Sequence, residues 1–175
     1  MKSARQEILD KLKNAVTSVP EMPDFDAPVY HPIEGPLELA FKKNLEIVNG
    51  SVHLFKSEKD LFNNLSQFLS SNNKENICCN EIEIQNQLQK FQVPFSNCPE
   101  LPKDIEIGIT SCEFLIAHTG SVMVSSAQKG GRQMFIYPPI HVVIAHKNQL
   151  TDFLESPYRG IQEKYKENLP SQITL

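Results

Sequence analysis

Residues 104–146 read DIEIGITSCEFLIAHTGSVMVSSAQKGGRQMFIYPPIHVVIAH, and this segment decides the fold. It contains four of the seven glycines and three of the five histidines of the chain. Short apolar runs rich in β-branched residues alternate with glycine-containing turns, which is typical of β-strands joined by short connections. The polar residues of these turns would meet along one edge of a sheet, so we expect the functional site there.

The length and composition of the chain indicate one soluble α/β domain. Its 175 residues are enough to bury a proper core, and its 40% hydrophobic and 22% charged residues are ordinary for a globular protein. No apolar run reaches the roughly 18 residues that span a bilayer, and the charged N-terminus does not resemble a signal peptide. A net charge of −4 without a basic stripe argues against nucleic acid as a partner. We therefore expect a cytoplasmic protein that binds neither membranes nor nucleic acid.

The N-terminal part of the sequence differs in character from the rest. Ser3 can cap a helix whose apolar face contains Ala4, Ile8 and Leu12. Residues 20–36 then contain five of the twelve prolines, which excludes a helix or a central strand. We predict an N-terminal helix and proline-rich arm over residues 1–36, followed by the α/β domain over residues 37–175.

Hydrophobic periodicity predicts alternating helices and strands on both sides of the central segment. Before it, we expect helices over 37–48, from Ser57 through Leu69 and around 84–91, with short strands at 52–54 and 77–79 and a loop at 94–102. After it, we expect helices at 150–154 and 158–165 and the beginning of a strand at 173–175. Such alternation predicts βαβ units and a parallel sheet.

The four cysteines show no spacing typical of a metal or redox site. Cys78 and Cys79 are adjacent and would face opposite sides of a strand, while Cys98 and Cys112 stand apart. Structural zinc and iron–sulfur clusters need cysteines at short, paired or clustered spacings. We therefore predict free, mostly buried thiols in a reducing compartment. No metal site is predicted, and no phosphate-binding or dinucleotide-binding glycine motif suggests a cofactor.

Three segments carry a resemblance to a known family: GITSCEFLIAHTGSVMV (108–124), GGR (130–132) and YPPIHVVIAHKNQL (137–150). They resemble the LUD domain of the lactate-utilisation protein C family. The resemblance implies a NagB/RpiA/CoA-transferase-like fold, an open and mostly parallel sheet with helices on both faces. It also implies a subunit of a bacterial system that oxidises L-lactate to pyruvate, in which partner subunits carry the iron–sulfur clusters and this chain carries none.

The sequence departs from the family pattern at two places. His118 stands where family members commonly carry an acidic residue, immediately before the Thr-Gly-Ser turn. Family members also continue into a Gly-Pro-Ser-x-Thr-Ala-Asp-Ile-Glu motif about where this chain ends at Leu175. Either the chain is a truncated form, or part of the expected site and the last strands are missing. A missing strand would leave apolar surface for a partner or a second copy in a homodimer.

Three residues of the central segment are candidates for acid–base catalysis. Glu113 lies at the mouth of an apolar run, where partial burial would raise its pKa and make it a general base. His118 and His141 lie at strand ends and could move a proton or bind an anion. The alternatives are a solvated carboxylate at a strand end and two structural histidines.

Two turns are candidates for ligand binding. Thr119, Gly120 and Ser121 offer hydroxyl and backbone N–H groups that can surround a carboxylate or phosphate. Gly131 and Arg132 place a guanidinium on a flexible backbone, which suits bidentate binding of a carboxylate. The alternatives are an ordinary tight turn and an exposed arginine on a hairpin loop.

Two functions remain open on the sequence alone. The chain is either an interaction or ligand-binding subunit of a lactate-oxidation complex without a complete active site, or a stand-alone enzyme or binding protein. The second function would use the cluster Thr119–Arg132–His141 for a small carboxylate or phosphate. A buried Glu113 facing Arg132 across an open pocket would favour the enzyme.

Overall fold

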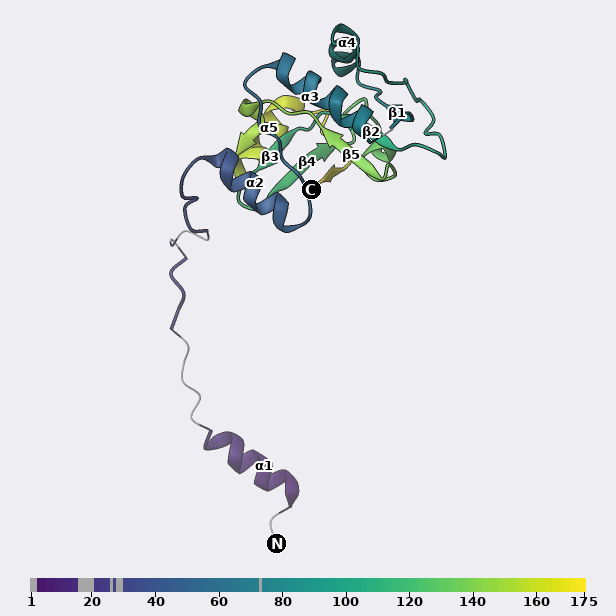
Figure 1. Ribbon diagram of the computed structural model, residues 1–175. Helices are drawn as coiled ribbons and strands as arrows, with labels where there is room; N and C mark the ends of the chain where they lie inside the picture. Colours follow the sequence, from purple (N-terminus) through teal and green to yellow (C-terminus); the bar gives the residue numbers. More distant parts are fainter. Residues whose placement is uncertain (1–2, 16–20, 26, 28–29, 73) are drawn as a thin grey trace. The chain divides into compact units, whose positions relative to one another are not determined.

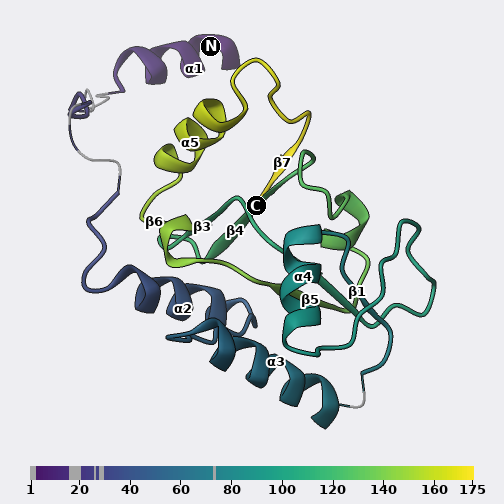
Figure 2. The same ribbon diagram turned by 90° about the horizontal axis from the view of Figure 1, so that it is seen from above.

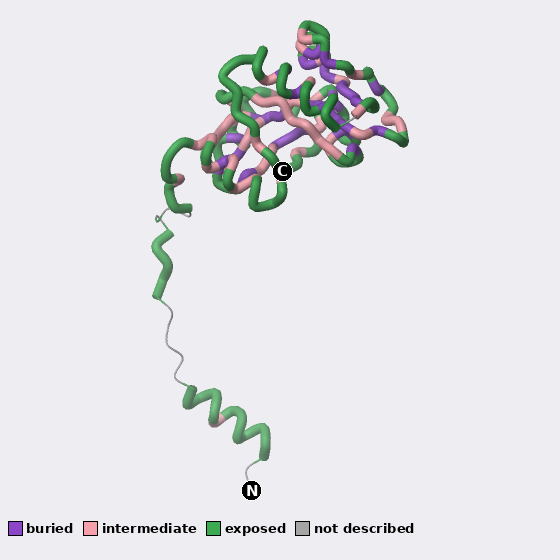
Figure 3. The backbone as a smooth tube through the Cα atoms, viewed as in Figure 1, coloured by how far each residue is buried: buried purple, intermediate pink, exposed green. Residues whose placement is uncertain are grey.

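The computed structural model describes residues 3–15, 21–25, 27, 30–72 and 74–175 (Figure 1). The chain divides into two units, Met1–Pro32 and Ile33–Leu175, which are described separately. In the first unit, α1 (Ala4–Lys13) begins after Ser3, whose hydroxyl accepts a hydrogen bond from the backbone N–H of Gln6 at 3.4 Å. The predicted N-terminal helix is therefore present, and none of its residues is buried (Figure 3). Parts of the predicted arm lie outside the described residues, so the boundary between residues 36 and 37 stays a prediction.

The second unit contains a parallel three-stranded sheet in the order β1-β2-β5. Its strands are β1 (Ile77–Cys78), β2 (Ile107–Thr110) and β5 (Ile140–Val143). Because β2 has a neighbour on both sides, all four of its residues are buried. β2 is therefore a fully buried strand that begins at Ile107.

A second sheet has four strands in the order β6-β3-β4-β7. Its strands are β6 (Leu150–Thr151), β3 (Phe114–Ile116), β4 (Ser121–Ser125) and β7 (Ile173–Thr174). The β3–β6 pair is parallel, whereas β4 pairs antiparallel with both β3 and β7. Parallel pairing thus accounts for most strand pairs in the two sheets. The predicted α/β class with mostly parallel pairing is confirmed.

Among the described residues of the second unit, four α-helices and two short 3₁₀-helices accompany the sheets (Figure 2). They are α2 (Leu37–Ile47), α3 (Glu58–Ser71), α4 (Ile82–Lys90), η1 (Arg132–Phe135), η2 (Lys147–Gln149) and α5 (Glu155–Tyr165). The helices α2 and α3 lie on one side of the strands, and α5 lies on the other. The start of α3 agrees with its predicted cap, since the Ser57 hydroxyl accepts a hydrogen bond from the backbone N–H of Asp60 at 3.1 Å.

Three clusters of buried apolar residues form the core. The largest joins α3 and α4 to β1 and β2 and includes Cys79, whereas Cys78 belongs to a smaller cluster with Met134. The adjacent cysteines therefore face opposite sides of β1, as predicted. The third cluster packs Ile161 of α5 against Ile116 and Met123.

Two elements predicted from the sequence are wrong. Residues 52–54 form no strand, although their apolar residues alternate. The expected helix at 150–154 is replaced by β6, because Leu150 and Thr151 pair with Leu115 and Ile116 of β3. The helix begins only at Glu155. No helix in the described part of the chain is long and apolar enough to cross a membrane.

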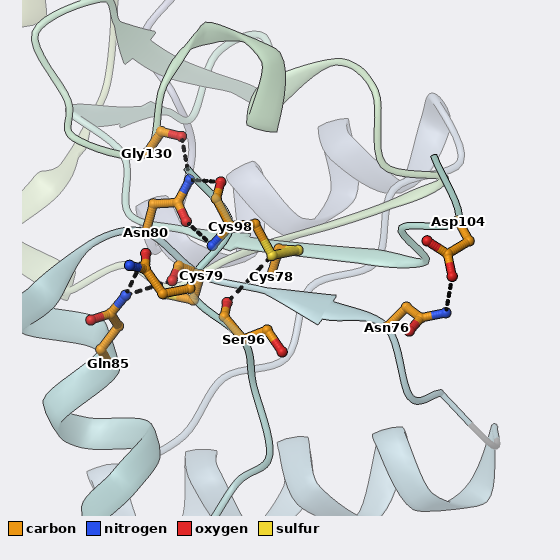
Figure 4. The surroundings of a disulfide bond; sticks show 10 residues. Asn76, Cys78, Cys79, Asn80, Gln85, Ser96, Cys98, Asp104 and Gly130 are labelled. Carbon is orange, nitrogen blue, oxygen red and sulfur yellow. Dashed lines mark hydrogen bonds between the residues drawn. A yellow bond between two sulfur atoms is a disulfide. The ribbon is translucent and has the colours of Figure 1, made fainter. Parts of the chain in front are cut away.

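The prediction of four free thiols is also wrong. Cys78 and Cys98 form a disulfide with their Cα atoms 5.8 Å apart (Figure 4). The backbone explains the pairing, because Ser96 lies beside β1 and its N–H donates to the carbonyl of Ile77 at 2.8 Å. The β-bridge between Cys78 and Ser96 brings Cys98 next to Cys78, although the two cysteines are 20 residues apart in the sequence. No short cysteine motif signals this pairing. Cys79 and Cys112 are free and buried, as expected.

Candidate ligand-binding site

Arg132 and His141 line a common cleft of about 360 Å³, which we call the first cleft. Arg132 begins η1, directly after Gly131, and His141 is the second residue of β5. Gly120 and Ser121 also line this cleft. The remaining wall comes largely from apolar residues of α2, β4 and η1 and from the C-terminal segment: Leu45, Val48, Val122, Val124, Phe135, Ile136 and Leu175. Four of the eight predicted site residues therefore meet at one hollow.

The Arg132 side chain is exposed and retains most of its hydrogen-bonding capacity. Its Nη1 donates to Oε1 of Gln172 at 3.4 Å. Among the residues that the structure describes, no carboxylate lies within ion-pair distance of this guanidinium. A guanidinium carries five N–H donors in a planar arrangement that matches a carboxylate or phosphate. Arg132 can therefore bind an anionic ligand without breaking an internal ion pair.

His141 is a neutral hydrogen-bonding group that lines the first cleft. Its Nε2 lies 2.8 Å from Oγ1 of Thr110, whose hydroxyl donates to the carbonyl of Ser111 at 3.0 Å. We assign the imidazole proton to Nε2, which then donates to Thr110, because the Thr110 hydroxyl already donates to Ser111. Burial lowers the pKa of His141, so the imidazole is neutral at pH 7. In this tautomer Nδ1 is left as an acceptor.

The turn at 119–121 is packed against α2 and offers less to a ligand than its sequence suggests. Gly120 is buried with φ +68°, and a Cβ atom there would lie 2.3 Å from the backbone nitrogen of Leu45. The Gly120 N–H donates to the carbonyl of Ile116 at 2.9 Å and so is not available to an anion. Thr119 is exposed, and its hydroxyl donates to that of Ser121 at 2.8 Å. Of these residues, Ser121 presents the polar side chain to the first cleft.

His118 does not line the first cleft. Its ring contacts that of Phe153, with centroids 5.2 Å apart, and its backbone N–H donates to the carbonyl of Asp152 at 3.0 Å. Its own carbonyl accepts a hydrogen bond from Nδ2 of Asn44 at 2.9 Å. The structure thus does not bring His118 together with Arg132 and His141.

Glu113 is buried in an ion pair rather than facing Arg132. Its Oε2 lies 2.6 Å from Nζ of Lys164, and Oε1 accepts hydrogen bonds of 2.6 Å from the hydroxyls of Ser125 and Tyr165. Burial alone would raise the pKa of Glu113, but these hydrogen bonds outweigh it and lower the pKa overall. The expected rise of the pKa is therefore wrong. The carboxylate joins α5 to β4, and Glu113 does not line the first cleft.

Sequence reasoning missed a second carboxylate at the carboxyl ends of β1 and β2. Glu81 is buried and accepts a hydrogen bond from the backbone N–H of Ser111 at 3.0 Å and another from the Ser111 hydroxyl. Gln128 donates to the same hydroxyl at 3.0 Å. Ligands of open parallel sheets bind beyond this end of the strands. The signal in the sequence was a glutamate placed shortly after the apolar run Ile77–Cys78–Cys79.

A second cleft of about 280 Å³ lies beside η1 and is also lined by Arg132. Asn80, Cys98, Pro99 and Leu101 line it from the region around the disulfide. Residues 130–134 complete the lining, including Gly131 with φ +80°. In the part of the chain that the structure describes, no group of three or more His, Cys, Asp or Glu side chains could hold a metal ion.

Comparisons with known proteins agree with this architecture. Residues 96–174 match the family model of the LUD domain, and this segment includes Arg132, His141 and most of the lining of the first cleft. This segment is therefore similar to LUD domains. A crystal structure of a DUF162 family protein from Deinococcus radiodurans is similar with a TM-score of 0.64 at 15% sequence identity. The similarity covers 79% of this chain and 84% of that one, so it shows a shared fold. No curated protein matches the chain.

Proposed function

We propose that this chain is a subunit of a bacterial L-lactate utilisation system and binds a small 2-hydroxy or 2-oxo carboxylate in the first cleft. The LUD match over residues 96–174 supports the association with lactate utilisation. The three segments that resemble the lactate-utilisation protein C family support the more specific role in oxidation of L-lactate to pyruvate.

The observation that carries the proposal is the shared position of Arg132 and His141 at one largely apolar cleft. The guanidinium would bind the ligand carboxylate through paired N–H···O bonds. The free Nδ1 of the neutral imidazole would accept a hydrogen bond from a 2-hydroxyl group, and the Ser121 hydroxyl offers a further contact. Apolar walls suit the methyl group of lactate and strengthen the polar contacts by excluding water.

The oxidation itself involves partner subunits in this proposal. Conversion of L-lactate to pyruvate removes two electrons and two protons, and the iron–sulfur subunits would accept the electrons. The role of this chain is to bind and orient the carboxylate, with His141 placed to take the hydroxyl proton. Its predicted lack of a cofactor of its own agrees with this division, and its cytoplasmic location remains part of the proposal.

A stand-alone binding protein or enzyme for a small carboxylate or phosphate is the second candidate. The observation that favours it is that Arg132 and His141 already share a cleft within one chain. Thr119, the third member of the predicted cluster, directs its hydroxyl to Ser121 and does not line the cleft. The isolated chain would therefore bind its ligand through Arg132, His141 and Ser121 without a partner.

The first test is a thermal-unfolding titration of the purified chain with L-lactate, D-lactate, pyruvate and phosphate. A ligand present at 100 times its dissociation constant stabilises the native state by about 2.7 kcal/mol. We expect stabilisation by L-lactate or pyruvate that is lost in Arg132→Ala. Arg159→Ala is the matched control, because Arg159 is an exposed arginine on α5 paired with Glu155 at 2.6 Å. Its variant should bind like the unmodified chain.

Reconstitution separates the two candidate functions. We expect L-lactate oxidation by the iron–sulfur subunits to require this chain and to fall in the Arg132→Ala variant. Stabilisation by phosphate alone, with lactate oxidation unaffected when the chain is omitted, would favour the stand-alone protein. Equal binding of L-lactate by the unmodified chain and by Arg132→Ala would exclude the first cleft as the site.

A further inference from the structure

The disulfide Cys78–Cys98 lies at the wall of the second cleft, next to the segment that carries Arg132. Cys98 lines this cleft and is 8% exposed, whereas Cys78 is 1% exposed on β1. Both cysteines are buried in one core cluster, and Cys98 is the one that lines the cleft. The proposed function places the chain in the cytoplasm, where glutathione and thioredoxin keep structural thiols reduced, so a disulfide there is usually one that is made and broken in use.

We propose that Cys78–Cys98 is a reversible thiol–disulfide exchange site that accepts a dithiol through the second cleft. A thiolate of the dithiol attacks the sulfur of Cys98, the Cys78–Cys98 bond breaks, and Cys78 leaves as a thiolate that takes up a proton. The second thiol of the reductant then attacks the mixed disulfide and releases Cys98 as a thiol. Two electrons and two protons pass to the protein, and the dithiol becomes a disulfide.

The other two cysteines do not interfere with this exchange. Cys79 faces the opposite side of β1, in a different core cluster from Cys78. Burial raises the pKa of the Cys79 thiol to about 11 and that of the Cys112 thiol to about 12. Because the thiolate is the attacking species, neither residue can rearrange the bond in the folded chain. Reduction should therefore yield two specific thiols.

Hydrogen bonds connect the exchange site to the loop before η1. Asn80 accepts a hydrogen bond from the backbone N–H of Cys98 and donates to the Cys98 carbonyl, both at 2.8 Å (Figure 4). The same Nδ2 group donates to the carbonyl of Gly130 at 3.5 Å, two residues before Arg132. Met134 of η1 packs in the same core cluster as the disulfide. Breaking the bond should loosen the loop around Cys98 and, through Asn80, the backbone that positions Arg132.

The test is alkylation of the native full chain during a titration with dithiothreitol. We expect Cys98 to be alkylated first on reduction and Cys78, which is 1% exposed, more slowly, while Cys79 and Cys112 react only after denaturant is added. Oxidised dithiothreitol should restore the bond. Hydrogen exchange should increase on reduction at residues 96–101 and 130–134 and stay unchanged in α5. A disulfide that resists dithiothreitol until the chain unfolds, or four cysteines that react together, would overturn the proposal.

Two variants serve as controls. Cys112→Ala removes a buried free thiol and should leave the titration unchanged, whereas Cys98→Ser should show the hydrogen exchange of the reduced chain. If Cys98→Ser does not fold, the alkylation of the unmodified chain still decides the question. The effect on Arg132 rests on the proposed function, so L-lactate binding is measured in both redox states. Binding that is equal in both states overturns the coupling, whereas binding absent in both contradicts the proposed function and leaves the exchange site standing.

Discussion

At the scale of single residues, Glu113 shows that burial does not by itself make a carboxyl group a base. Glu113 is 5% exposed, yet Lys164, Ser125 and Tyr165 all donate hydrogen bonds to its charged form. Hydrogen bonds to a carboxylate favour ionisation more strongly here than desolvation opposes it. Glu113 is thus held as an anion, whereas His141, with one neutral hydroxyl partner, is held uncharged.

The pH dependence of stability should reveal this ion pair. The pKa of Glu113 in the folded chain lies below its ordinary value of 4.5, so its stabilisation is fully present above that value. It is lost as the pH falls through the lowered pKa, because the unfolded chain takes up the proton first. Glu113→Gln should therefore lower the free energy of unfolding at pH 7 by about 2 kcal/mol and flatten its decline below pH 4.5.

Chemical denaturation of both chains from pH 7 downward would measure this difference. Glu155→Gln is the control, since the exposed pair between Glu155 and Arg159 is expected to contribute less than about 1 kcal/mol. A Glu113→Gln chain that is as stable as the unmodified one at pH 7 would contradict the assignment.

At the scale of elements, the contact between α2 and the turn before β4 fixes one side of the first cleft. Asn44 of α2 donates hydrogen bonds to the carbonyls of Ala117 and His118 at 2.8 and 2.9 Å. The next residue, Leu45, lies directly on Gly120 and also lines the cleft. A glycine at position 120 is required both by its positive φ and by this close approach.

Two glycine substitutions should separate these requirements. Gly131→Ala introduces a side chain at φ +80° with no atom within 4 Å, so strain alone should cost about 1 kcal/mol of unfolding free energy. Gly120→Ala adds a steric conflict with the backbone of α2 at a similar φ of +68°, and should cost at least about 3 kcal/mol. Thermal and urea unfolding of the two variants would measure both values. Equal losses of unfolding free energy in the two variants would show that α2 does not constrain the turn at Gly120.

At the scale of the whole molecule, the rim of the first cleft is apolar and open. Val48, Ile136 and Leu175 are 66%, 71% and 53% exposed and come from different parts of the chain. An apolar rim around a site that contains one cation is suited to contact with another protein. In the proposed lactate-utilisation complex, a partner subunit would cover this rim.

Association should depend on Ile136 more than stability does. Ile136→Glu should weaken binding to the partner subunits, or to a second copy, at least tenfold, because a charge would be buried at the contact. The free energy of unfolding of the single chain should change by less than about 0.5 kcal/mol, since the side chain is exposed. Light scattering and titration with the partner would measure association. Ile82→Glu, at an exposed position of α4 away from both clefts, is the control, and equal weakening in both variants would contradict the assignment.

Local signals in the sequence predicted the elements that depend on near neighbours. Ser3 and Ser57 begin helices as expected, because an N-cap is made within one turn. The pairing of Leu150 with Leu115 was not predictable, since a partner strand 35 residues away overrides the local preference. The disulfide was missed for the same reason, because Ser96 and Ile77 meet only once the chain has folded.

The candidate site was predictable in part. The residue types that bind small anions suggested Arg132 and His141, and the structure places both at one cleft. The surroundings of Glu113 and Gly120 depend on α5 and α2, which lie far from them in the sequence. Periodicity cannot show which helix will cover a turn or pair with a carboxylate. Their roles in the site stay predictions. In the structure, Glu113 forms an ion pair with Lys164, and Gly120 packs against α2.

The position of Arg132 between the two clefts has one more consequence. Arg132 lines both clefts, so the two clefts are not independent binding sites. An anion that binds the Arg132 side chain in one cleft makes that side chain unavailable in the other cleft. Anionic ligands of the two clefts would therefore exclude each other. A molecule designed for the cleft beside the disulfide could therefore inhibit the binding of an anion in the first cleft without entering that cleft.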